Sequence, residues 1–233
     1  MKKWLAANEI YFKTLASLIL SISAIVISIL QFTNTALQRT IAEAQAMPQF
    51  DIAIHKKNTG SDNFYDTAYL TVINNGGPVS QFNAKVIYFL KSEIATKENQ
   101  FTLHKIQFPV NGYFATQLLS SNSRGELTTY FQYDNCRKIH SLVMNMMQSA
   151  QDRGLIFVST DEVVYISLYY TDLLQREHVE YYKVNFIGSA ERLQSEEGEQ
   201  IFTEYTKSTP RELSSLNAND IINELLNNQR NNN

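Results

Sequence analysis

Hydrophobic residues form one uninterrupted segment near the N-terminus, Leu15–Phe32, and no charged residue occurs between Lys13 and Arg39. A helix of this length rises about 27 Å, close to the thickness of the hydrocarbon core of a bilayer. Because lipid offers no hydrogen-bond partners to the backbone, we expect residues 14–32 to form a transmembrane helix and the chain to cross once. A cleaved signal peptide is the alternative, but its apolar region would be shorter and a small-residue cleavage site would follow it.

A second pattern runs along the same segment. Small or polar residues recur at alternating steps of three and four, which is the heptad spacing of packed helices. Small side chains let transmembrane helices approach closely, and hydroxyl or amide groups can bond across the contact. Three interpretations stay open: a lone anchor whose serines bond their own helix, a homo-oligomer packed through this face, or a face that lines a narrow wet pore. We call this face the seam; it comprises Thr14, Ser17, Ser21, Ala24, Ser28, Gln31, Thr35 and Gln38, and its spacing continues to Ala42 and Gln45.

Both flanks of the span have their own pattern. Good helix formers without Gly or Pro follow it, so we expect residues 33–47 to extend the helix as a short stalk. Pro48 then stops the helix, because proline lacks an amide hydrogen and favours extended geometry in the residue before it. Residues 1–13 predict an interfacial lead-in, in which Trp4 and Tyr11 suit the headgroup zone; an ordinary frayed terminus is the alternative.

After the proline the hydrophobic period changes to two, beginning with Phe50, Ile52 and Ile54. A strong turn signal at residues 74–78 separates two alternating runs. Tyr and Phe number 13 each, which suits strands that pack a real core. Together these features predict that residues 48–188 form a mainly β domain, an antiparallel β-sandwich or barrel-like fold.

Local patterns within and after this domain predict its details. Apolar residues at helical spacing predict one inserted helix at residues 135–154. The polar residues 91–100 predict a loop, and residues 155–172 predict two strands with a turn between them. Residues 189–233 predict an acidic, partly helical C-terminal region, with a last weak helix beginning at Pro210 and a disordered end.

Charge bears on sidedness and partners. Lys2, Lys3 and Lys13 precede the span and only Arg39 follows it closely, so the positive-inside rule favours a cytoplasmic N-terminus and a β domain outside. Beyond these flanks the chain carries 16 basic and 21 acidic residues. That balance argues against a surface that wraps duplex nucleic acid. Cys136 is the single cysteine, so the chain can form no internal disulfide.

The sequence contains no recognisable catalytic motif. Neither a G-x-S-x-G elbow nor a glycine-rich phosphate loop occurs. Cys136 and His140 are four residues apart, but zinc needs three or four ligands and no second pair has suitable spacing. The adjacent Asp161 and Glu162 are better explained by a solvated turn than by acid–base catalysis. We therefore expect no enzymatic activity, no metal and no cofactor.

Aromatic and basic residues give the one candidate ligand site outside the span. Tyrosines recur on two neighbouring predicted strands, with basic residues at the turn between them and at the start of the inserted helix. Tyrosine rings with arginine or lysine nearby can hold a small anionic or base-bearing ligand. Cross-strand aromatic packing in a β core is the alternative. The candidate residues are Tyr165, Tyr169, Tyr181, Arg137, Lys138 and Arg176.

The layout also carries a resemblance. A span and stalk end at Met47-Pro48-Gln49-Phe50, and a β domain follows that contains LTVINNGGPVSQF and LYYTDLLQRE. Over residues 14–187 this resembles bacterial single-pass membrane proteins with a β-sandwich-like domain, as in Hailong-type anti-phage membrane effectors. The resemblance implies an inner-membrane location, a cytosolic sensor domain, oligomerisation and a pore that opens on infection. It also implies a nucleotide or oligonucleotide signal from a partner nucleotidyltransferase.

Two functions follow from these observations. The first is a membrane effector of an anti-phage defence system, which oligomerises through its transmembrane helix to form a gated pore while the β domain senses a ligand or partner. The second is a membrane-tethered binding module without channel activity, displayed on either side of the bilayer. A structural subunit of a larger membrane complex is a further alternative. The cytosolic sensor that the resemblance implies is opposite to the orientation that the flanking charges favour.

Overall fold

The computed structural model describes residue 4 and residues 8–57, 67–96, 102–186 and 190–227. It divides into two compact units, Met1–Met47 and Pro48–Asn233, and we call the second unit the β domain. Six of the thirteen residues of the predicted lead-in lie outside the described residues. The predicted disordered end is residues 226–233; its first two residues belong to a helix, and residues 228–233 lie outside the described residues. Each unit is considered by itself.

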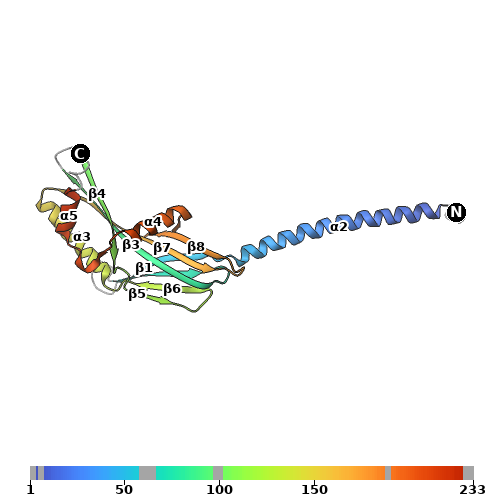
Figure 1. Ribbon diagram of the computed structural model, residues 1–233, viewed down its shortest axis with the longest axis horizontal. Coiled ribbons are helices and arrows are strands. Elements are labelled where there is room, and N and C mark those ends of the chain that lie inside the picture. The colour runs from blue at the N-terminus through green and yellow to red at the C-terminus, as the bar shows by residue number, and fades with distance from the viewer. Residues whose placement is uncertain (1–3, 5–7, 58–66, 97–101, 187–189, 228–233) are drawn as a thin grey trace. The chain divides into compact units, whose positions relative to one another are not determined.

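The N-terminal unit is one continuous helix, α2 (Glu9–Ala46), with no break between the predicted span and the predicted stalk (Figure 1). Among the described residues it is the one helix long and apolar enough to cross a membrane, and no part of its most apolar window is buried within the chain. Its 38 residues rise about 57 Å, well beyond the roughly 20 residues that a bilayer requires. The helix ends at Ala46, and the capping residue Met47 has an extended backbone, as expected before a proline.

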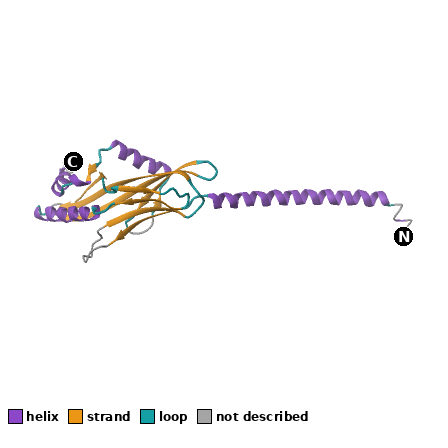
Figure 2. Cartoon of the chain, turned by 90° about the horizontal axis from the view of Figure 1, so that it is seen from below, coloured by secondary structure: helices purple, strands orange, loops and turns teal. Residues whose placement is uncertain are grey.

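Ten strands in the described residues confirm the expectation of a mainly β fold (Figure 2). They form two sheets, one in the order β1-β2-β6-β5 and the other in the order β10-β4-β3-β7-β8-β9. Every pairing is antiparallel except that of β10 with β4. The strands are β1 (Phe50–Lys57), β2 (Thr67–Asn74), β3 (Ser80–Thr96), β4 (Thr102–Asn111), β5 (Thr116–Leu119), β6 (Gly125–Phe131), β7 (Ile156–Thr171), β8 (Glu177–Val184), β9 (Glu191–Arg192) and β10 (Arg211–Glu212).

One hydrophobic core joins the two sheets. Leu70 of the four-stranded sheet and Leu90 and Ile166 of the six-stranded sheet belong to the same buried cluster and are fully buried. The predicted period of two places these side chains inward on their strands. Burying each such side chain contributes about 1.5–3 kcal/mol, so this shared core is the main source of the domain's stability.

Helices complete the domain. The predicted inserted helix is present as α3 (Asn135–Asp152), and Met146 on its inner face is fully buried. The C-terminal region forms α4 (Ser195–Lys207), a 3₁₀ turn (Leu213–Ser215) and α5 (Ala218–Asn227). The buried residues of these last two elements, Leu213, Ile221, Ile222 and Leu225, belong to the same core as the sheets.

Three local predictions were wrong. The expected loop at 91–100 begins as strand, because β3 runs on to Thr96 with Ser92 and Ile94 pointing inward. The two strands expected within 155–172 are the single strand β7, which pairs with β3 along its whole length. Pro210 does not begin a helix; β10 and the 3₁₀ turn follow it, and the last helix begins at Ala218.

Because β7 is one continuous strand, Glu162 lies in the middle of a strand and not in a solvated turn. The hydroxyl of Tyr88 donates to Oε2 of Glu162 at 3.0 Å, and the ring of Tyr88 stacks on that of Tyr113 at 4.0 Å between centroids. Burial raises the pKa of the Glu162 carboxyl, and the two phenol groups and Lys56 offset this only in part. The carboxyl therefore retains its proton more readily in the folded chain than in the unfolded one.

We expect Glu162→Gln to flatten the pH dependence of stability. Above the unfolded pKa of about 4.3, the Glu162 carboxyl binds more protons in the native state than in the unfolded state. The stability that this carboxyl contributes therefore falls as pH rises through its raised folded pKa. Glutamine cannot titrate but can still accept the Tyr88 hydrogen bond. Urea unfolding of the detergent-solubilised chain at several pH values between 4 and 8 measures this. Parallel profiles for wild type and variant would contradict the expectation.

Candidate functional site

The seam residues lie along the exposed surface of α2, and their hydroxyl groups are bonded within the helix. Ser17 Oγ donates to the carbonyl oxygen of Thr14 at 2.8 Å, and Ser21 Oγ donates to that of Ser17 at 2.9 Å. Ser28 and Thr35 make the same kind of bond to the preceding turn. These four hydroxyl protons are thus satisfied in a single chain, as the lone-anchor interpretation expects, while each of the four oxygens can still accept a bond from another helix.

The shape of the helix at the seam favours close packing. A shallow depression on the helix includes two seam residues, and its lining consists of Ala24, Ile25, Ser28, Ile29 and Phe32. Such a depression lets a second helix approach the backbone. A heptad pattern drifts by about 20° per heptad around a straight helix, so helices joined along the whole seam would have to wind around each other with a left-handed supercoil.

The predicted tyrosines share one face of the six-stranded sheet. Ser167 pairs with Tyr181, and Tyr169 pairs with Val179 on the adjacent strand, which places Tyr165, Tyr169 and Tyr181 on the outer face. This face is partly covered by α4. The ring of Tyr181 lies 5.4 Å from that of Phe202 between centroids, and Gly198 packs directly on it.

Tyr165 belongs to the same aromatic layer. Its ring contacts Phe89 edge-on at 5.9 Å between centroids, and Phe89 in turn contacts Tyr205 of α4 at 5.9 Å. Burial raises the pKa of the Tyr165 hydroxyl, with a further contribution from nearby Glu197. These contacts match the packing alternative for Tyr165 and Tyr181. Tyr169 lies on the same face and is half-buried.

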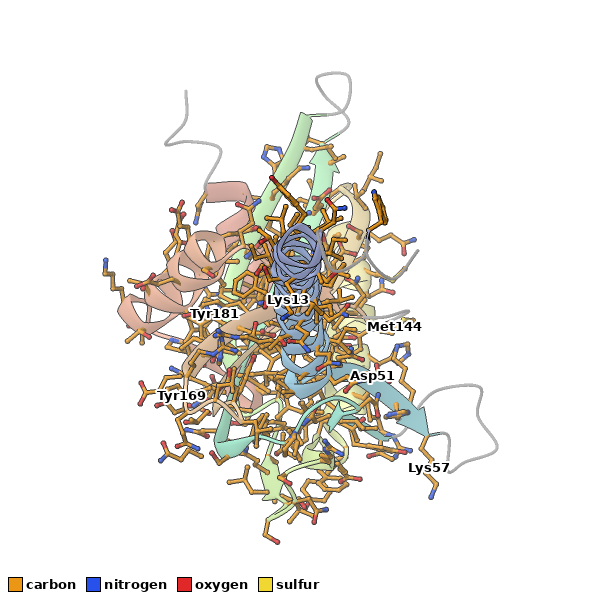
Figure 3. The ribbon with its side chains drawn as sticks, turned by 90° about the vertical axis from the view of Figure 1, so that its right-hand side faces the viewer. Lys13, Asp51, Lys57, Met144, Tyr169 and Tyr181 are labelled. Atoms are coloured by element: carbon orange, nitrogen blue, oxygen red, sulfur yellow. The ribbon has the colours of Figure 1, made fainter. Side chains whose placement is uncertain are left out.

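The predicted basic residues do not join the tyrosines. Figure 3 shows Tyr169 and Tyr181 on one side of the β domain and Met144, which belongs to α3, on the other. Arg137 and Lys138 belong to α3, so they are separated from the tyrosine face. Arg176 is at the turn between β7 and β8. The six residues therefore do not form one site.

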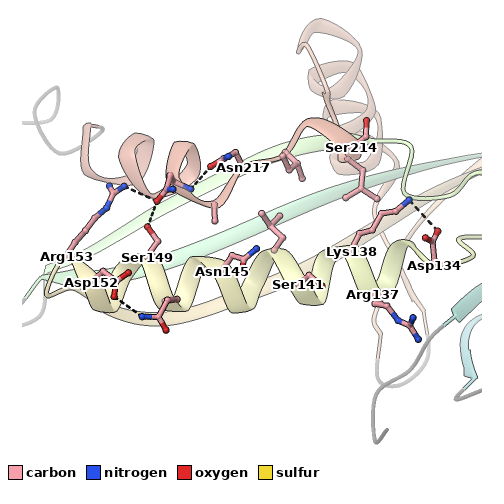
Figure 4. A pocket seen from close by; sticks show the side chains of 16 residues that line it. Asp134, Arg137, Lys138, Ser141, Asn145, Ser149, Asp152, Arg153, Ser214 and Asn217 are labelled. Atoms are coloured by element: carbon pink, nitrogen blue, oxygen red, sulfur yellow. Dashed lines mark hydrogen bonds and ion pairs between the residues drawn. The ribbon is translucent and has the colours of Figure 1, made fainter. Parts of the chain in front are cut away.

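Arg137 and Lys138 instead line a groove between α3 and the C-terminal segment (Figure 4). The groove has a volume of about 820 Å³, within the range of small-molecule sites. Leu142, Leu213 and Leu216 contribute apolar surface. The polar lining consists of Asp134, Arg137, Lys138, Ser141, Asn145, Gln148, Ser149, Asp152, Arg153, Ser214, Asn217 and Asn219.

Charges lie toward the two ends of the groove and are already partnered. Figure 4 shows Lys138 and Arg153 toward opposite ends, with Asn145 between them. Lys138 Nζ lies 3.4 Å from Asp134 Oδ1. Arg153 donates to the side-chain oxygens of Asn223 at 2.6 Å and Asn219 at 3.2 Å. This arrangement suits an elongated polar ligand that bonds amide and hydroxyl groups along the middle and meets a cation at each end.

The sequence analysis missed half of this groove. Ser149 on α3 donates to Asn219 at 2.7 Å, although 70 residues separate the two in sequence. Asn217 and Asn219 stand at the start of α5, where no periodic or motif signal distinguishes them from other asparagines. No pattern in one sequence could have indicated that this segment packs beside α3.

An exposed aromatic row on the four-stranded sheet was also missed. His55 stacks on Tyr69 at 4.9 Å between centroids, Tyr69 lies 6.1 Å from Phe131, and Phe131 lies 6.2 Å from Tyr133. The period of two along β1 and β2 could have placed His55 and Tyr69 outward. Each ring in the row contacts the next, as in cross-strand aromatic packing.

We expect Gly198→Ala to destabilise the β domain, although alanine is the better helix former by about 1 kcal/mol. A Cβ at this position would overlap the ring of Tyr181, so α4 would have to shift from the sheet. Such overpacking costs about 1–3 kcal/mol. Thermal unfolding measures the effect, with Glu199→Ala, an exposed neighbour on the same helix, as the control. Equal or greater stability of the Gly198 variant would show that α4 does not pack on Tyr181.

Comparison with known proteins adds no relative to this picture. No family model, curated protein or solved structure matches the chain. The functional argument therefore starts from the seam and the groove.

Proposed function

We propose that this chain is a membrane effector of a bacterial anti-phage defence system, in which α2 anchors the protein and oligomerises through the seam to form a gated pore. The observation that carries the proposal is the continuity of the seam along one unbroken, uncovered helix. Small and polar positions from Thr14 to Gln38 occupy the same heptad positions in the span and in the stalk. A lone anchor would need no such pattern beyond the lipid.

The β domain acts as the sensor in this proposal. The groove between α3 and the C-terminal segment is large enough for a small ligand and includes Arg137 and Lys138, two residues that the sequence had singled out. The resemblance to Hailong-type effectors suggests a nucleotide or oligonucleotide made by a partner nucleotidyltransferase as the signal. The groove's mixed charges also suit a protein partner.

A membrane-tethered binding module without channel activity is the second candidate. The specific observation in its favour is that the seam hydroxyls of Ser17, Ser21 and Ser28 are bonded to carbonyls of their own helix. Serines bonded in this way are compatible with a helix that faces lipid on all sides. This candidate predicts that any apolar helix of the same length can replace the span.

Leucine substitutions in the span separate the two candidates. We expect Ser21→Leu to weaken self-association, because the larger side chain prevents the helices from approaching. Ser23→Leu is the matched control: the same change two residues away, at similar depth, but off the seam. With contacts worth about 0.6–1.7 kcal/mol per helix, the oligomer should dissociate at roughly three- to twentyfold higher protein concentration for Ser21→Leu. Adding Ser17→Leu and Ser28→Leu should abolish it.

Two measurements decide the outcome. Sedimentation of the detergent-solubilised chain reports the oligomer, and K⁺ release from proteoliposomes reports a pore. Indistinguishable behaviour of the Ser21 and Ser23 variants in both assays would contradict the seam's role. The chain could form oligomers while the proteoliposomes release no K⁺, with or without the nucleotidyltransferase product. That result would leave the tethered binding module as the function.

The sidedness of the β domain gives a separate test. The effector proposal requires the β domain in the cytoplasm, although Lys2, Lys3 and Lys13 favour the opposite orientation. A reporter fused after Asn233 that is active only in the cytoplasm should therefore be active. A reporter that is active only outside the membrane would exclude a cytosolic signal as the direct trigger.

A further inference from the structure

The turn between β7 and β8 presents two adjacent leucines to solvent. Leu173 is 56 % exposed and Leu174 is 47 % exposed. Single exposed leucines are ordinary on a protein surface, but a neighbouring pair at the tip of a hairpin forms a small apolar projection. We call these two residues the leucine tip.

The turn that carries the leucine tip is held in one conformation. Asp172 is buried, and its carboxylate accepts from the backbone N–H of Arg176 at 2.9 Å and from the Arg176 Nε at 2.8 Å. His178 Nε2 lies 2.9 Å from the same carboxylate. Gln175 closes the turn in the left-handed region, with φ 62°, and its N–H donates to the Asp172 carbonyl.

These contacts join the two sides of the turn that carries the leucines. Burial opposes the charge of Asp172, but the Arg176 and His178 donors hold the pKa of that carboxyl well below its usual value. The ring of His178 also stacks on Tyr170 at 5.1 Å between centroids. A rigid turn keeps the leucine tip ready to make a contact with little loss of conformational entropy.

The leucine tip lies at the end of the β domain where β1 begins. Thr171, next to the turn, pairs with Ser80, and Tyr170 contacts Phe50 at 4.9 Å between ring centroids. At this same end, the N–H of Asn75 donates to the carbonyl of Gln49 at 2.8 Å. We call this the proximal end of the domain.

We infer that the leucine tip is a second contact between copies of this chain, next to the helix contact made by the seam. The inference rests on the proposed self-association of α2. Only Met47, Pro48 and Gln49 separate α2 from β1, so copies whose helices associate must also bring the proximal ends of their β domains near one another. Apolar side chains held rigidly at that end then pack against the neighbouring copy.

A lipid surface is the other apolar partner that such a projection could meet. The length of α2 argues against it, since 38 residues are more than a bilayer requires and the excess follows the apolar segment toward β1. A neighbouring copy is therefore the better occupant, and the experiment below separates the two.

Cross-linking between single cysteines tests the inference on the full chain in membranes. In a Cys136→Ser background, Leu174→Cys should give cross-linked dimers with a short bis-maleimide, at several times the yield of Leu103→Cys. Leu103 is a matched control, since it is 47 % exposed like Leu174 but pairs with Ala95 toward the far end of β3. Gln38→Cys, on the seam outside the predicted span, serves as the positive reference.

Each outcome has one meaning. Cross-linking at positions 38 and 174 but not at 103 supports the inference. Cross-linking at 38 alone overturns it while the proposed self-association stands, and this is also the result expected if the leucines face lipid. Equal yields at positions 174 and 103 would show that the cross-links arise from random collision, and this would overturn the inference. Absence of cross-linking at all three positions overturns both this inference and the proposed self-association.

A second measurement does not depend on cysteine chemistry. Leu173→Asn combined with Leu174→Asn should lower the stability of the oligomer, so that it dissociates at a severalfold higher protein concentration, whereas Leu103→Asn should not. Circular dichroism and thermal unfolding establish that each variant is folded. An unchanged dissociation profile for a folded double variant would overturn the inference.

Discussion

The apolar surface of α2 has no covering partner within the described chain, and the rest of the protein's behaviour depends on how that surface is removed from water. In an aqueous setting the helix would expose a long series of leucine and isoleucine side chains, each of which contributes about 1.5–3 kcal/mol when it is buried. Lipid can cover most of this surface. Other helices can cover the small and polar face, where close approach of backbones is more favourable than contact with acyl chains.

The β domain removes its own apolar side chains from water by packing them together. Two sheets, α3 and the C-terminal segment bury their apolar side chains in one cluster, so the domain needs no membrane and no second copy to form its core. The two surface features described above lie outside this core. The groove lies where α3 meets the segment before α5, and the leucine tip lies where β7 turns into β8.

Two carboxyl groups, one partly buried and one buried, have opposite roles in this domain. Glu162 is surrounded by phenol groups, and burial raises its pKa. Asp172 accepts from cationic and backbone donors, which lower its pKa despite burial. The first tends to keep its proton and the second its charge. The carboxyl group thus accepts a bond from a phenol hydroxyl in one place and fixes a surface turn in the other.

The sequence by itself determined the elements whose patterns are local. A long uncharged run indicates a helix of membrane length, alternation from Phe50 onward indicates strands, and the spacing of Ile139, Leu142 and Met146 indicates α3. The seam could also be defined in this way, because helical geometry alone determines which residues share a face. The role of that face stays a prediction.

Only the tertiary structure decided what depends on contacts between distant segments. The sequence predicted a polar loop that contains Ser92 and Ile94, but the pairing of β3 with β7 places both side chains inward. It also predicted a solvated turn at Glu162, which instead lies within the continuous strand β7 and accepts from Tyr88. The sequence left open whether Tyr181 binds a ligand or packs in the domain, and the contacts of its ring with Phe202 and Gly198 of α4 show that it packs. The groove joins α3 to residues some 70 positions later, and nothing local in the sequence records that contact, because long-range packing leaves no period to detect.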